Sequence, residues 1–219
     1  VLAAPSGATA HCQPVAKANL TGCNFAHRSL KGDDLRGANF TGDNLTGANL
    51  SGANLLTARL VNVNLTRANL TGASIYGAIL TGAKLDGANL SHLVGTDAYF
   101  RRATLTGVTF SHAYLAGADF VRDSLVGANL VGVNLAGADL YDANLTRANL
   151  TGDDVSDADL AGTNFTGATL RHADVSESNL AGTIFAGAVL TGISSGSNTG
   201  APKSLPSGWH YANHSLVGP

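Results

Sequence analysis

Residues 48–52, with the sequence ANLSG, and residues 68–72, with the sequence ANLTG, represent the pattern that decides the fold of this 219-residue chain. The same five-residue phase runs from Leu20 to Leu190 without an insertion. Its 35 central positions hold 24 Leu, all seven Phe, two Val, one Ile and a single exception, Gly95. A period of five fits neither an α-helix, which repeats every 3.6 residues, nor an alternating strand, which repeats every two.

Each position of the repeat has its own composition. Two residues before the centre Ala occurs 22 times in 35, and two residues after it Gly occurs 21 times. The residue just before the centre is usually Asn or Asp, and the residue just after it is often Thr or Ser. We expect the central and small residues to point inward. Because five residues cannot bury an apolar face alone, successive coils must stack to build a continuous core.

On these residues the sequence resembles the pentapeptide-repeat proteins, whose motif is a small residue, Asp or Asn, Leu or Phe, and two polar or small residues. The resemblance implies an all-β fold, a right-handed quadrilateral β-helix with four pentapeptides per coil and about nine coils. We expect an irregular N-terminal cap in residues 1–15, the pentapeptide-repeat solenoid in residues 16–192, and a linker with a C-terminal cap or tail in residues 193–219.

The two ends carry the features that the repeat does not explain. Cys12 and Cys23 either form a disulfide that ties the cap to the first coil or remain two thiols, and the sequence leaves this open. Near the C-terminus two short apolar runs flank Ala212-Asn213 and predict a hairpin, and Trp209 is expected to cover the last coil. Residues 1–5 look like what remains of a processed export signal, which favours a bacterial protein that is secreted or held at the cell surface.

Composition excludes several classes of function. The formal net charge of −2 argues against a nucleic-acid binder, and no apolar run is long enough to span a bilayer. We expect no catalytic residues, no cofactor and no metal site, because no catalytic constellation emerges and a core of Leu and Phe leaves no substrate cavity. His92 and His112 lie in one outward column, and solvent-exposed histidines are the favoured interpretation there.

Residues twenty apart should stack, which turns the sequence into a surface map. Aromatic and Arg side chains, types enriched at interfaces, gather at outward positions of neighbouring coils. Gly95 lies in the same stretch and should leave a void, allow a bulge, or be compensated by Leu93 or Val94. We interpret this Tyr/Arg band as a protein-binding patch, with ordinary surface variation as the alternative. Its members are Tyr76, Tyr99, Arg101, Arg102, Tyr114, Arg122 and Tyr141.

The leading hypothesis is therefore a non-catalytic structural or protein-interaction rod that forms a homo-oligomer through an end or through the Tyr/Arg band. The alternative implied by the family is a cytoplasmic, DNA-mimicking protein that binds gyrase and is linked to antibiotic resistance. Stacked Asp119, Asp139 and Asp159 keep that alternative open. A minor alternative is an ice-binding solenoid, suggested by outward Thr residues in one column that Asp86 and Val126 interrupt.

Overall fold

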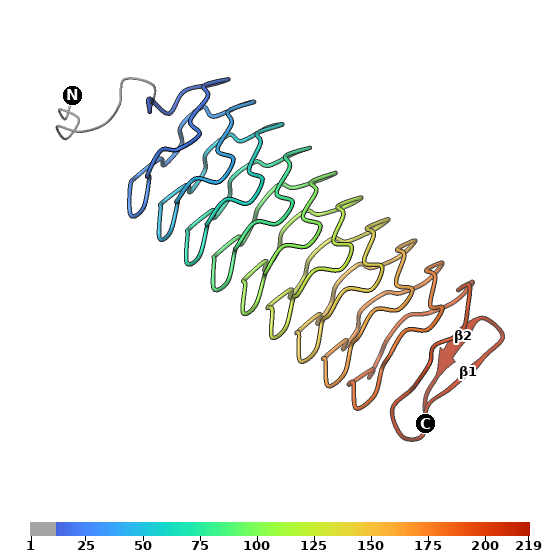
Figure 1. The fold of residues 1–219 in the computed structure, drawn as a ribbon. Helices are drawn as coiled ribbons and strands as arrows, with labels where there is room; N and C mark the ends of the chain where they lie inside the picture. The colour runs from blue at the N-terminus through green and yellow to red at the C-terminus, as the bar shows by residue number, and fades with distance from the viewer. Residues whose placement is uncertain (1–11) are drawn as a thin grey trace.

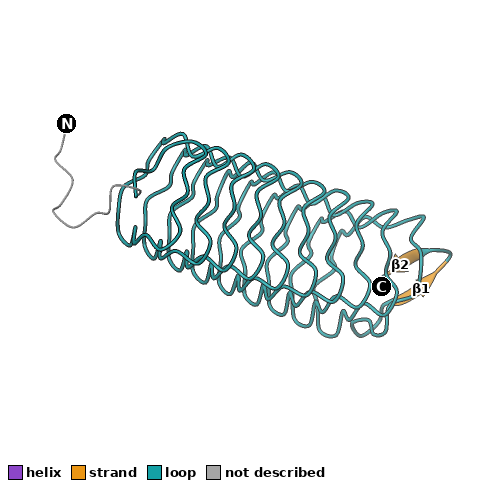
Figure 2. Cartoon of the chain, turned by 45° about the horizontal axis from the view of Figure 1, so that its top comes forward, coloured by secondary structure: helices purple, strands orange, loops and turns teal. Residues whose placement is uncertain are grey.

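A computed structural model describes residues 12–219 as a rod of stacked coils (Figure 1). A parallel β-ladder joins each residue that precedes a centre to the residue twenty positions later, and it runs from Asn19 to Ser204, or about nine coils. Figure 2 shows the same coils from a second direction, with the strand arrows confined to the C-terminal end. The predicted right-handed quadrilateral β-helix is confirmed.

Backbone hydrogen bonds between coils hold the rod together. The Leu50 N–H donates to the Asn69 carbonyl at 2.7 Å, and the Asn69 N–H donates back to the Ala48 carbonyl at 2.9 Å. Within the coil, the Ala53 N–H donates to the Leu50 carbonyl at 3.0 Å and closes the corner. Because an unpaired buried backbone group is costly, the same pattern recurs on every face.

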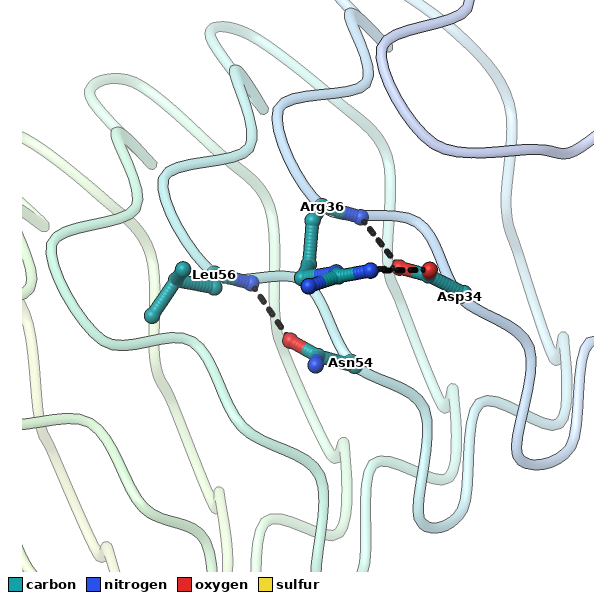
Figure 3. A network of polar contacts seen from close by, with 4 residues as sticks. All are labelled: Asp34, Arg36, Asn54 and Leu56. Atoms are coloured by element: carbon teal, nitrogen blue, oxygen red, sulfur yellow. Dashed lines mark hydrogen bonds and ion pairs between the residues drawn. The ribbon is translucent and has the colours of Figure 1, made fainter.

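The Asn or Asp before each centre has a local task at the corner. The Asn54 side-chain oxygen accepts the Leu56 N–H at 3.2 Å, and Asp34 accepts the Arg36 N–H at 3.3 Å while also pairing with the Arg36 guanidinium (Figure 3). A short side-chain oxygen that accepts a backbone N–H two residues on stabilises a turn. We call this arrangement an Asx corner.

The break at Gly95 is compensated by its neighbour. Leu93 is fully buried although it stands at a position that usually holds Ala, whereas Val94 is exposed. A Cβ added to Gly95 would lie 2.9 Å from Leu115 Cδ2 and 3.1 Å from Leu93 Cδ2. Leu93 has therefore moved into the volume that a central side chain would fill, and the core remains continuous.

We predict that Leu93→Ala lowers the free energy of unfolding by roughly 2–5 kcal/mol, the range for large-to-small changes in a core. Adding Gly95→Leu to that variant restores the usual pairing of a small residue with a large centre and should recover most of the loss. Gly95→Leu alone should be destabilising through overpacking. Urea denaturation of the three variants measures the coupling, and simple additivity would contradict the compensation.

Three buried aspartates replace small residues inside the rod, namely Asp43, Asp123 and Asp153. Asp123 Oδ1 accepts the Ala103 N–H at 2.8 Å, and Asp153 Oδ1 accepts the Val133 N–H at 3.0 Å, in each case one coil earlier. Burial raises the pKa of both carboxyl groups from 3.8 to about 8. Both therefore carry a proton in the folded chain at neutral pH, which brings the net charge of the rod close to zero.

These shifts make stability fall with rising pH. Below pH 3.8 the Asp153 carboxyl is protonated in both states, and between about 4 and 8 only the unfolded chain releases the proton. Each unit of pKa difference corresponds to about 1.4 kcal/mol, so the loss accumulates across that window. We predict that Asp153→Asn, which retains the acceptor, raises the Tm at pH 8, leaves it nearly unchanged at pH 4, and flattens the profile. An unchanged difference between the two pH values would refute the raised pKa.

The N-terminal end is tied to the rod by a disulfide between Cys12 and Cys23, with Cα atoms 5.8 Å apart. Of the two alternatives that the sequence left open, a disulfide or two free thiols, the structure contains the disulfide. Residues 1–11, most of the expected cap and all of the expected signal remnant, lie outside the described residues.

The C-terminal end closes with the predicted hairpin. Strand β1 (His210–Ala212) pairs antiparallel with β2 (Ser215–Val217) beside the last coil (Figure 1). Leu216 is buried, and its N–H donates to the Ser195 hydroxyl at 2.9 Å. Trp209 is partly buried and packs against the core, at the end where the sequence placed it.

The expected linker after residue 192 needs correction. Ser194, Thr199 and Ser204 still form ladder bridges to residues twenty positions earlier. The ladder uses backbone groups, which any residue except proline supplies, so the coil continues after the Leu centres end. The solenoid boundary that the sequence placed at residue 192 therefore falls inside the last coil.

Candidate functional site

The seven residues of the Tyr/Arg band lie on one face of the rod, on its two flanking corners and, in the case of Tyr114, in the ladder column of the neighbouring face. The ladder column of this face runs through Ile79, Tyr99, Asp119 and Asp139. Beneath it, the rings of Phe100 and Phe120 stack with centroids 4.6 Å apart. The band thus rests on a rigid, fully packed part of the core.

The first flank of the face carries a cluster of exposed apolar surface, which we call the Tyr edge. Tyr76, Tyr99 and Tyr114 expose 45%, 47% and 60% of their surface, and Val94 exposes 42%. Val94 and Tyr114 are direct ladder partners, so the cluster belongs to consecutive coils. Exposed aromatic surface on a rigid support is typical of protein-binding sites.

The second flank carries the arginines and is called the Arg edge. Arg101 pairs with the nearly buried Asp119, and this hydrogen bond raises the pKa of Arg101. Arg122 lies 3.5 Å from Asp142 and stacks over the Tyr141 ring at 5.9 Å. Arg102 makes no ion pair with any residue in the described part of the chain. The structure therefore divides the predicted band into an aromatic half and a cationic half.

A further signal in the sequence marks this region and was missed. Of the nine positions that precede a centre between residues 74 and 114, only Asn89 can form an Asx corner. Between residues 119 and 164, nine of the ten equivalent positions are Asn or Asp. Val94, Tyr99 and Tyr114 thus replace corner-stabilising residues with large exposed side chains, and Ile79 does so with a half-buried one. The band lacks the hydrogen bonds that stabilise the other corners and carries exposed side chains in their place. Such a loss of local stability is typical of functional sites.

The remaining surface columns form as the twenty-residue register requires. Asp119, Asp139 and Asp159 are successive ladder partners, and burial raises the pKa of Asp139. The His92 and His112 rings stack with centroids 5.5 Å apart, yet residues 12–219 contain no cluster of three or more metal-binding side chains. Thr46 and Thr146 donate their hydroxyls to their own Asx-corner oxygens.

Pockets in the described part of the chain are shallow. One of about 400 Å³ lies beside Trp209 under the hairpin, and one of about 250 Å³ lies at the Arg edge. No helix among residues 12–219 is long and apolar enough to cross a membrane. The exposed Tyr/Arg band is the arrangement with the clearest capacity for binding, since it combines apolar area with fixed charges.

Comparison with known proteins identifies the family of the repeats. The pentapeptide repeats family profile matches in eight copies, over residues 18–55, 57–91, 96–122, 124–152 and 154–193. No match was found among curated proteins.

Several solved structures are similar in sequence over much of the chain. HetL, a pentapeptide repeat protein involved in heterocyst differentiation regulation in the cyanobacterium Nostoc, is 28% identical, covers 81% of this chain and 85% of its own, and gives a TM-score of 0.31. QnrB1, a plasmid-mediated fluoroquinolone resistance protein, is 22% identical over 78% of this chain and 86% of its own, with a TM-score of 0.42. A pentapeptide repeat protein from the Arabidopsis thaliana thylakoid lumen is 29% identical over 64% and 70%, with a TM-score of 0.19.

Proposed function

Because the chain belongs to the pentapeptide-repeat family, whose members are generally structural or binding proteins, we propose that it is a non-catalytic interaction rod that self-associates through the Tyr/Arg band. The observation that carries this proposal is the loss of Asx corners between residues 74 and 114, where Val94, Tyr99 and Tyr114 place large exposed side chains at three of the eight positions that lack Asn or Asp. The role of the rod would be to present this surface at fixed spacing.

The charge pattern of the band face supports a second copy as the partner. Along one ladder column the outward residues change from Arg59 through Tyr99 to Asp119, Asp139 and Asp159. A two-fold axis across the Tyr edge would bring Arg59 of one copy toward the aspartates in the same column of the other. A net charge close to zero adds little long-range repulsion between copies.

Association through the C-terminal end is the less favoured geometry. Strands β1 and β2 lie beside the last coil (Figure 2), and Leu216 is buried there. A covered end offers fewer free backbone groups to a second rod. This favours the Tyr/Arg band over the C-terminal end as the contact.

We also propose that the protein acts outside the cytoplasm, secreted or at the cell surface. The disulfide between Cys12 and Cys23 supports this location, because such bonds persist mainly in oxidising compartments. Free thiol labelling of protein isolated from its source without reduction tests it: unreactive cysteines are expected, and two reactive thiols would oppose export.

The decisive test uses variants that restore the repeat. Tyr114→Asn should let the new amide accept the Ala116 N–H, as Asn134 accepts the Ala136 N–H at 3.0 Å one coil later. We expect this variant to melt at a higher temperature, gaining about 1 kcal/mol from the added bond, and to weaken self-association at least about tenfold. Sedimentation velocity over a concentration series measures the second effect.

Thr109→Asn is the matched control, since it restores an Asx corner on a different face. It should raise the melting temperature to a similar degree and leave association unchanged, because Asn89 one coil earlier accepts the Ser91 N–H at 3.0 Å. A wild-type protein that stays monomeric at the highest soluble concentration would reject self-association. Equal loss of association in both variants would reject the Tyr edge as the contact.

The gyrase-binding alternative depends on the acidic columns of the C-terminal half. Asp119, Asp139 and Asp159 stack, but Arg101 pairs with Asp119 and protonated Asp123 and Asp153 add no charge at neutral pH. This weakens the likeness to a duplex of phosphates. Gyrase supercoiling with a fluoroquinolone, with and without the protein, separates the two functions: neither inhibition nor protection is expected here.

A further inference from the structure

The Arg edge contains a small pocket lined almost entirely by groups that bind anions. It has a volume of about 250 Å³ and is lined by Thr81, Arg101, Arg102, Val121 and Arg122. Three of these five residues carry guanidinium groups, one carries a hydroxyl, and none carries a carboxylate. Guanidinium groups match the geometry of oxyanions because each presents parallel N–H donors.

Two of the arginines occupy a costly arrangement. Arg102 and Arg122 stand in the same corner column one coil apart, so their backbones are separated by about 5 Å. Both have a positive φ, of 61° and 60°, a backbone conformation that residues other than Gly, Asn and Asp seldom adopt. This corner column therefore combines two neighbouring positive charges with two residues in an unfavourable backbone conformation.

Other arginines at such corners are accommodated differently. Arg147, with a φ of 58°, is followed one coil later by Gly167, over which its side chain lies. Arg67 lies over Gly87 in the same way. Below Arg102 there is a second arginine instead of a glycine, so its guanidinium is not spread over a bare backbone.

The backbone of this corner is also opened. The Ala103 N–H donates to Asp123 Oδ1 at 2.8 Å, whereas the equivalent Ala143 N–H donates to the Leu140 carbonyl at 2.9 Å and closes its own corner. The bond from the Arg102 N–H to the Val121 carbonyl is stretched to 3.4 Å. A buried side chain thus reshapes the floor of the pocket.

The positive charge is only partly balanced by the protein itself. Arg101 is bound to Asp119, and Arg122 is 3.5 Å from Asp142, but Arg102 has no ion pair within residues 12–219. Burial raises the pKa of Asp123 to about 8, so this carboxyl does not neutralise the guanidinium groups at neutral pH. An anion between Arg102 and Arg122 would relieve their mutual repulsion.

We propose that this pocket binds an oxyanion, a sulfate or phosphate group, between the guanidinium groups of Arg102 and Arg122, with Arg101 and the Thr81 hydroxyl as further donors. The proposal goes beyond the protein-binding role of the band and does not depend on it. The pocket accepts the free ion or the same group on a larger ligand, since its outer side opens to solvent.

The test is a titration with sodium sulfate and, separately, sodium phosphate, with sodium chloride keeping the ionic strength constant. We expect saturable shifts of the Arg Nε–Hε NMR signals, and an affinity at least about tenfold lower in Arg102→Gln and in Arg122→Gln. Arg147→Gln is the matched control, because it removes a corner arginine of the same backbone conformation that lies over a glycine. It should leave the affinity unchanged.

Thermal melting of all three variants checks that they fold, since each change is on the surface. A sulfated disaccharide that binds more tightly than sulfate would identify a larger ligand, and equal affinity would identify the free ion; both outcomes support the site. Linear shifts without saturation, or equal losses in Arg147→Gln and Arg102→Gln, would overturn it. Tyr114→Asn should not alter sulfate binding, so this site and the self-association contact can fail independently.

Discussion

The backbone ladder between coils is the constraint on which the rest of the molecule depends. Every residue that precedes a centre pairs with the residue twenty positions later, from Asn19 to Ser204. One inserted residue would rotate all later side chains and expose the core, so the register admits substitution but not insertion. The chain therefore adjusts by substitution at fixed positions: the large Leu93 side chain fills the space that the missing side chain of Gly95 leaves.

Much of the fold could be predicted from the sequence, because the ladder fixes where each residue lies in a coil by its place in the five-residue repeat. The five-residue period predicted the inward residues and the stacking of coils, and the resemblance to pentapeptide-repeat proteins implied the four-sided coil from which the surface columns follow. What the sequence could not predict depends on contacts outside the repeat. From the sequence, either Leu93 or Val94 could have filled the space at Gly95. The structure shows that Leu93 does so, in the volume next to Ile75 and Leu115.

The ends and the candidate site illustrate two further limits. Composition after Leu190 suggested a linker, since Ser and Gly are frequent there, but backbone bridges need no Leu centre and extend the coil to Ser204. The band residues were recognised as aromatic and cationic, whereas their division into two edges follows from ion pairs such as Arg101 with Asp119. The missing Asx corners were visible in the sequence, but their meaning required knowing that Asn and Asp close the turns.

The two ends of the rod differ in how the chain is secured, and this gives the molecule a mechanical direction. A disulfide locks the first coil to the segment before it, whereas the last coil is held by a hairpin and by contacts such as Leu216 with Ser195. Because each coil touches only its neighbours, a pulling force would peel the rod one coil at a time. The segment between Cys12 and Cys23 cannot extend while the disulfide is intact, whereas the hairpin is held by noncovalent contacts alone and would separate from the last coil under force.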